Sequence, residues 1–177
     1  NWKKVSDDTS EFLSQYHDIP FKGEVPENIT PNSPVRNYPY YMNFAGERLL
    51  ITGGGHIANR LDRPGTIMTF ENNTWNSFQE EGISEQTKHR YDDINCIVQD
   101  PKDAAHHFAA SAGEGIYEFK DGKFINWYSM HNSPLESAVP NEPWADSYVR
   151  VNGLIYDKEN NLWMVSCETQ HAVSVLM

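Results

Sequence analysis

One pattern of apolar residues recurs along this chain at a spacing of about 50 residues, the length of a structural repeat. Residues 67–75 (IMTFENNTW) align with residues 116–124 (IYEFKDGKF). The coinciding apolar pairs, each 49 residues apart, are Ile67 and Ile116, Phe70 and Phe119, and Trp75 and Phe124. Each copy is a strand, a two-residue turn and a second strand, because Asn72-Asn73 and Asp121-Gly122 tolerate the positive φ of tight hairpins.

A second repeated unit also occurs twice. Its first copy comes just before residues 116–124, and its second copy comes later in the chain. Residues 94–111 match residues 151–166, with Asp100, Phe108 and Ser111 opposite Asp157, Trp163 and Ser166. Residues 40–52 form a weaker third copy, and Asn160-Asn161 is a further predicted two-residue turn. Four short strands per repeat are typical of propeller blades. We therefore predict an all-β chain that forms a partial β-propeller.

The repeats divide the chain into an arc of about three to four four-stranded antiparallel blades, cut from a larger ring of typically about 4–8 blades. We assign residues 1–37 to an N-terminal strand remnant and linker, 38–91 to a blade with a long Gly-rich loop, 92–147 to a second blade and 148–177 to an incomplete third blade. Helical periodicity is weak and is confined to residues 9–16.

Composition excludes several classes of partner. The chain has 14 basic and 25 acidic residues and a net charge of −11, whereas nucleic acids and anionic membranes need clustered lysine and arginine. Its apolar stretches are shorter than the about 18–20 residues of a membrane span. We expect no nucleic-acid partner and no membrane span in this segment, and a signal segment that is absent or already removed.

The two cysteines, Cys96 and Cys167, lie in separate strand-like runs without zinc-site spacing. We expect two separate, partly buried thiols, and a disulfide remains the alternative in an oxidising compartment.

Residues 157–166 (DKENNLWMVS) resemble the D-x-x-G-N-L-W-hydrophobic-x-[ST] signature of two-component regulator propeller repeats, with Asn160 in place of the usual glycine. Residues 115–119 (GIYEF) resemble the strand that follows in that repeat. Four further segments are similar to the N-terminal propeller of PorZ-type envelope proteins of Bacteroidetes: residues 33–38, 49–55, 63–70 and 132–135. Together these resemblances cover residues 33–177.

The resemblance implies a periplasmic or cell-surface, extracytoplasmic protein. Its first implied function is a non-catalytic sensing module of a two-component-type regulator that binds a glycan or small ligand. The first alternative is a structural component of a type IX secretion or surface attachment complex, with an envelope protein as partner. The second alternative is a polysaccharide hydrolase or lyase. Propellers host many functions, so the repeat indicates the fold more strongly than the chemistry.

Residues 53–65 (GGGHIANRLDRPG) form the most distinctive loop. Thr52 and Ile67 are 15 residues apart, against 5 for the corresponding Ser111 and Ile116. Long loops on a rigid sheet are common ligand sites, and arginine binds carboxylate or phosphate through two hydrogen bonds. We therefore assign ligand binding to His56, Asn59, Arg60 and Arg63. The alternative is that the glycines allow close passage of a neighbouring blade while the arginines pair with local acids.

No catalytic motif, metal site or cofactor is expected. His106 and His107 are adjacent in a strand and point to opposite faces, so one is expected to be buried and the other exposed. The pairs Asp92-Asp93 and Glu80-Glu81 are expected on solvated loops. A nucleophile elbow and a zinc-protease helix are both missing from the sequence.

Aromatic residues form 12% of the chain, enough for both a core and a binding platform. Those at equivalent repeat positions, Trp75, Phe124, Phe108 and Trp163, are expected to pack between blades. Trp144 does not repeat and is added to the ligand-binding residues. An arc of blades also leaves an open sheet edge, so we expect self-association through it.

Overall fold

The computed structural model describes residues 32–55 and 61–177. Its first sheet contains four strands in chain order, each antiparallel to its neighbour: β1 (Tyr41–Ala45), β2 (Arg48–Thr52), β3 (Ile67–Glu71) and β4 (Thr74–Ser77). A short helix, α2 (Ile83–Thr87), lies in the connection to the second sheet. The sequence analysis missed this helix because one turn leaves almost no periodic signal.

The second sheet repeats this order with β5 (Ile94–Asp100), β6 (Asp103–Ser111), β7 (Ile116–Lys120) and β8 (Lys123–Tyr128). A 3₁₀ turn, η1 (Ala145–Ser147), precedes the third sheet. That sheet has three strands: β9 (Val151–Tyr156), β10 (Leu162–Ser166) and β11 (Val173–Leu176). Each sheet lies inside one predicted unit, and the unit boundaries themselves stay predictions.

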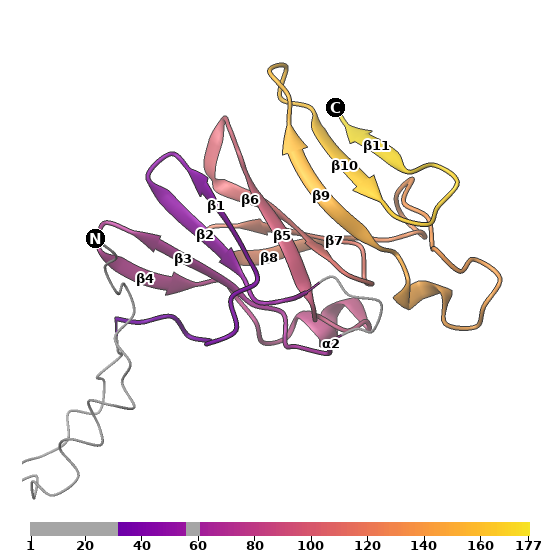
Figure 1. Cartoon of the computed structure of the whole chain (residues 1–177), viewed down its shortest axis with the longest axis horizontal. Helices are drawn as coiled ribbons and strands as arrows, with labels where there is room; N and C mark the ends of the chain where they lie inside the picture. The colour runs from indigo at the N-terminus through magenta and orange to yellow at the C-terminus, as the bar shows by residue number, and fades with distance from the viewer. Residues whose placement is uncertain (1–31, 56–60) are drawn as a thin grey trace, which may run out of the picture.

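The three sheets stand side by side with their first strands next to one another (Figure 1). β5 contacts β1 on one side and β9 on the other, so these strands form the inner wall of an arc. This is the arrangement of propeller blades around an axis, and the predicted all-β partial propeller is confirmed. Within the described residues, no helix is long and apolar enough to cross a membrane.

Two apolar clusters hold the arc together, one at each junction between sheets. Leu50 and Ile67 of the first sheet pack against Ile97, Tyr117 and Phe119 of the second. On the other side of the second sheet, Phe108 and Ile116 pack against Leu154, Leu162 and Met164. Strand alternation explains this pattern, because neighbouring residues of β6 face different junctions.

The predicted hairpin turns are confirmed in two of three places. Asn72-Asn73 and Asp121-Gly122 have positive φ at both positions, between 49° and 70°, which suits type I′ turns. The prediction for Asn160-Asn161 was wrong, because β9 and β10 are joined by the five residues 157–161 and only Asn160 has a positive φ.

Asp157 organises that five-residue turn. Its carboxylate accepts hydrogen bonds from the backbone N–H groups of Glu159 and Asn161, the Asn161 side chain and the Trp163 indole. These bonds lower the pKa of Asp157 to about 2, with the Trp163 bond contributing most. The aspartate and tryptophan of the repeat signature are therefore partners across one turn.

The repeated aromatic residues are not equally buried. Phe108 lies in the core, whereas Trp75 and Phe124 are half-buried. Trp163, the counterpart of Phe108, is 40% exposed. The expectation that Trp163 packs between blades was therefore wrong within the described structure, where no further sheet faces it. The predicted helix at residues 9–16 lies outside the described residues.

Cys96 and Cys167 form no disulfide within the described residues, as expected. Cys96 is buried in β5 between two sheets, and this burial raises its pKa to about 12. Cys167 is only half-buried. Since the thiolate is the reactive form, the two thiols should differ strongly in reactivity.

We predict that a thiol reagent near pH 8 modifies one cysteine per native chain quickly, and that this residue is Cys167. In the Cys167→Ser variant, rapid labelling should disappear, whereas denaturant should expose Cys96 in both proteins. Labelling of both thiols at similar rates in the native protein would contradict the burial of Cys96.

Candidate functional site

The longest described connections between strands lie at one edge of the sheets, here called the loop edge, which is formed by residues 53–55, 61–66, 78–93, 112–115, 129–150 and 167–172. This follows from the antiparallel order, which returns the chain to the same edge after every second strand. The opposite edge carries two-residue turns and the five-residue turn 157–161. In Figure 1, α2 and the long connection before β9 project from the loop edge. A rigid scaffold with long loops at one edge is suited to binding.

Of the predicted ligand-binding residues, His56, Asn59 and Arg60 lie outside the described residues. Arg63 and Trp144 are described and both lie at the loop edge, in the connections before β3 and before β9 respectively. They lie in different connections, and among the described residues no hydrogen bond, ion pair or ring contact joins the two. The binding role of all five residues stays a prediction.

Arg63 is held by its own surroundings. Its guanidinium lies 5.2 Å from the centre of the Tyr38 ring and donates a hydrogen bond to the Gly53 carbonyl at 3.4 Å. Its backbone N–H donates to Asp93. A cation over a tyrosine ring is an attractive arrangement, so Arg63 helps to fold the glycine loop in addition to any binding role.

The glycines of this loop permit close passage, which was the alternative in the sequence analysis. The Gly54 N–H donates to the carbonyl of Ile94 at 2.8 Å, joining the first sheet to β5. An ideal Cβ at Gly54 would lie 2.2 Å from the carbonyl carbon of Asp93. Only glycine fits this approach of two backbones.

Three carboxylates meet beside this loop. One oxygen each of Asp62, Asp92 and Asp93 lies within 4.8 Å of the others. Arg90 pairs with Asp62 at 2.5 Å and with Asp92 at 2.6 Å, while Asp93 accepts the backbone N–H groups of Asp62 and Arg63. Arg90 offsets one of the three negative charges, and two backbone N–H groups bind Asp93, so these carboxylates already have partners that tie the connections together.

The expectation of solvated acidic pairs was wrong for Asp92 and Asp93, which are both buried. Their buried position is stabilised by the Arg90 ion pair and by backbone donors, as buried charge requires. The sequence could not show this arrangement, because Asp62 comes from the β2–β3 connection and Arg90 and Asp93 come from the connection before β5.

A third buried acid, Glu114, lies in the β6–β7 connection. His89 Nδ1 is 3.6 Å from its carboxylate, and the His89 ring stacks on Trp127 with centroids 4.3 Å apart. The Trp127 indole donates to the Glu114 carbonyl. These contacts join α2 and β8 to the loop edge, and neither the sequence pattern nor the repeat indicated them.

Trp144 immediately precedes η1 in the connection before β9 and is 54% exposed. Turn hydrogen bonds run from Glu142 N–H to Val139 and from Ala145 N–H to Glu142, and Ala138 N–H bonds to Tyr148 across the base. The indole is therefore presented on an ordered loop. An exposed tryptophan on a rigid loop can anchor a partner at low entropic cost.

Two hollows follow the inner wall of the arc, and both include Tyr41 and Leu154. One of about 270 Å³ is flanked by Tyr40, Asn95 and Asn152, and one of about 540 Å³ by Asn43, Gln99 and Tyr156. No residue lining either hollow carries a charge. Their aromatic and amide chemistry suits a neutral polar group.

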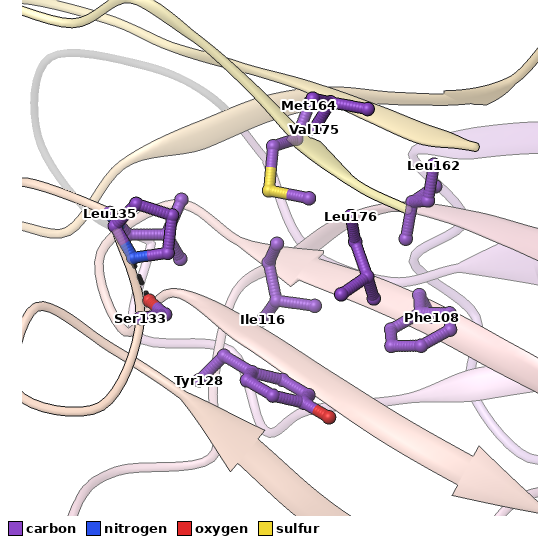
Figure 2. Close-up of a pocket in the computed structure, with 10 residues that line it drawn as sticks. Phe108, Ile116, Tyr128, Ser133, Leu135, Leu162, Met164, Val175 and Leu176 are labelled. Carbon is purple, nitrogen blue, oxygen red and sulfur yellow. Dashed lines mark hydrogen bonds between the residues drawn. The ribbon is translucent and has the colours of Figure 1, made fainter.

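A cavity of about 60 Å³ lies at the junction of the second and third sheets, and Figure 2 shows Phe108, Ile116 and Leu162 around it. Its lining is almost entirely apolar, so it offers water few partners. The hydroxyl of Tyr128 donates to Glu118. The volume is too small for a sizeable ligand, and the cavity is a packing gap in the junction.

The adjacent histidines of β6 occupy contrasting environments. His107 is 2% exposed, as one of the pair was expected to be. His106 is half-buried, with Nδ1 3.2 Å from Asp100 and Nε2 2.6 Å from Glu118. The two flanking carboxylates raise the pKa of His106 against an opposing effect of burial, which has the largest single influence. This group supports an ion-pair network in the fold.

Comparison with known proteins gives a likeness to a solved structure. No family model matches the chain, and no curated protein matches it. Among solved structures, the chain is similar to PorZ, described as an essential bacterial surface component of the type-IX secretion system of Porphyromonas gingivalis. The match has a TM-score of 0.74 and 25% sequence identity and covers 85% of this chain. The matched region is 20% of the PorZ chain, so this chain spans about a fifth of the length of PorZ and is similar to that part of it.

Proposed function

We propose that this chain is a non-catalytic docking part of a bacterial surface component related to PorZ and serving type IX secretion. The observation that carries the proposal is the structural likeness to PorZ over 85% of the chain at a TM-score of 0.74. The role of PorZ as a bacterial surface component of a secretion system supports an extracytoplasmic location and envelope protein partners for this chain.

The geometry of the candidate site fits a docking role better than a catalytic one. The described acids near the loop edge are bound to Arg90, to backbone groups or near His89, which leaves them suited to structural roles. Trp144, in contrast, is exposed on an ordered projecting loop. Buried aromatic anchors are common centres of protein interfaces.

The comparison favours the secretion alternative over the sensor function that the sequence analysis placed first. The likeness is to a secretion component. It supports the resemblance to PorZ-type envelope proteins and gives no support to the resemblance to two-component regulators. Glycan or small-ligand binding and a role in signal transduction have no support from it. The neutral hollows of the inner wall are where such a ligand would be sought.

Disruption of the gene in the source bacterium tests the proposal. We expect the extracellular amount of type IX cargo proteins to fall at least tenfold, and protease added to intact cells to digest the protein. Unchanged cargo export, or a protein protected inside intact cells, would overturn the proposal.

Complementation then tests docking at the loop edge. The Trp144→Asp variant should restore export poorly, because it removes the exposed indole. Ile125→Asp is the matched control, since Ile125 is similarly exposed but lies in β8, away from this edge. Equal export with both variants would place docking elsewhere on the protein.

A further inference from the structure

The outward face of the third sheet, defined here by Ile155, Trp163, Val165 and Val173, is apolar and open. Trp163 lies opposite Ile155 on β9, and Val165 lies opposite Val173 on β11, so the four side chains share one face. All four are exposed, from 40% for Trp163 to 67% for Ile155. Monomeric proteins rarely leave such a continuous apolar patch in water.

The repeat shows what kind of surface covers a face of this type. Trp163 is the counterpart of Phe108, and Phe108 is 4% exposed because the next sheet covers it with Leu162 and Met164. One junction earlier, Leu50 and Ile67 of the first sheet are covered by the second sheet in the same direction. Trp163 therefore points to where another sheet of this repeat would pack.

A surface of the required kind lies at the other end of the arc, on the outward face of the first sheet. Phe44, Leu49, Phe70 and Trp75 form one cross-strand row there. Phe44 is 66% exposed, and Phe70 and Trp75 stack with ring centroids 5.0 Å apart. This row is apolar and aromatic, like the faces that cover the other two junctions.

We propose that the outward face of the third sheet binds the outward face of the first sheet of a second copy of this chain, head to tail. Such a contact joins two different surfaces. It gives a closed ring when the rotation from one copy to the next divides a full turn. The described residues of one copy form three sheets, so those of two copies supply six, and six lies within the about 4–8 blades of closed propellers. The contact is independent of the secretion role, which could hold or fail without it.

Light scattering on the size-separated full chain, over a hundredfold range of concentration, tests this contact. We expect twice the mass of one chain, falling to the mass of one chain in Trp163→Glu and in Phe44→Glu. Ile125→Glu is the control, since this exposed residue of β8 lies in the second sheet, outside both faces, and the variant should leave the dimer intact. Circular dichroism establishes that each variant is folded.

Mixing the two single variants distinguishes a head-to-tail contact from a symmetric one. Each variant keeps one intact face, so an equimolar mixture should regain a dimer that neither variant forms alone. A wild-type chain that stays monomeric at the highest concentration would overturn the proposal. So would a dimer that Phe44→Glu leaves intact, because the third sheet would then pair with itself or with another surface.

Discussion

Replacing His107 by leucine is expected to make the protein more resistant to acid. Between about pH 7.5 and pH 4.5, the wild-type free energy of unfolding should fall by about 2.5 kcal/mol more than that of the variant. Urea denaturation at several pH values measures this difference. Near pH 7.5 the two proteins should have similar stability, because His107 is neutral there in both the folded and the unfolded state.

The effect follows from the place of His107 in the junction between the first two sheets. The ring packs edge-on against Phe78 with centroids 4.9 Å apart. Burial lowers its pKa from 6.5 to about 4, and the nearby positive charge of Arg48 adds to this. Between these two pH values the unfolded chain therefore binds a proton at His107 that the folded chain does not bind. The free energy of unfolding decreases as the pH falls from about 6.5 toward 4.

His106 provides the control, because its pKa shift has the opposite sign. The pKa of His106 is raised in the folded state. Its contribution to the free energy of unfolding is therefore fully present below pH 6.5, and it is lost as the pH rises through the folded-state pKa. His106→Gln should thus weaken the protein in mild acid and leave it less changed at alkaline pH. If His107→Phe and His107→Leu both retain the wild-type acid sensitivity, another group is responsible.

The fold was largely predictable from the sequence because each blade is a local unit. Apolar residues alternate along each strand, and asparagine, aspartate and glycine mark the turns. Both strands of a hairpin can therefore be located from a short stretch of sequence. The aligned pair Asp100 and Asp157 also fell at equivalent turns. Burial of Trp163 could not be predicted in the same way, because it depends on whether another sheet lies beside it.

The site was less predictable because its contacts join residues from different connections. Arg90 pairs with Asp62 across 28 positions, and Asp93 binds backbone groups 30 positions away or more. The inner-wall hollows combine side chains from three repeats. The sequence around any one of these residues gives no indication that it lines such a hollow. Trp144 could be singled out because it lies outside the repeat, and its binding role stays a prediction.

Replacing Gly54 by alanine is expected to cost about 3 kcal/mol or more of the free energy of unfolding. The added Cβ would lie 2.2 Å from the Asp93 carbonyl carbon and 2.4 Å from the Ile94 nitrogen. Both are backbone atoms, so relief requires the first sheet to move away from β5. That movement would also weaken the Gly54 N–H bond to Ile94.

Gly55→Ala is the matched control for this prediction, since it adds the same methyl group one residue later. There the closest atom is the Leu61 Cδ1, at 2.5 Å, which is the end of a flexible side chain and can rotate away. Urea denaturation of both variants should therefore show a much larger loss for Gly54→Ala. Equal losses would mean that the glycine run is needed only for loop flexibility. A selective loss at Gly54 would show that this glycine sets the approach of the first sheet to the second, and hence the geometry of the loop edge.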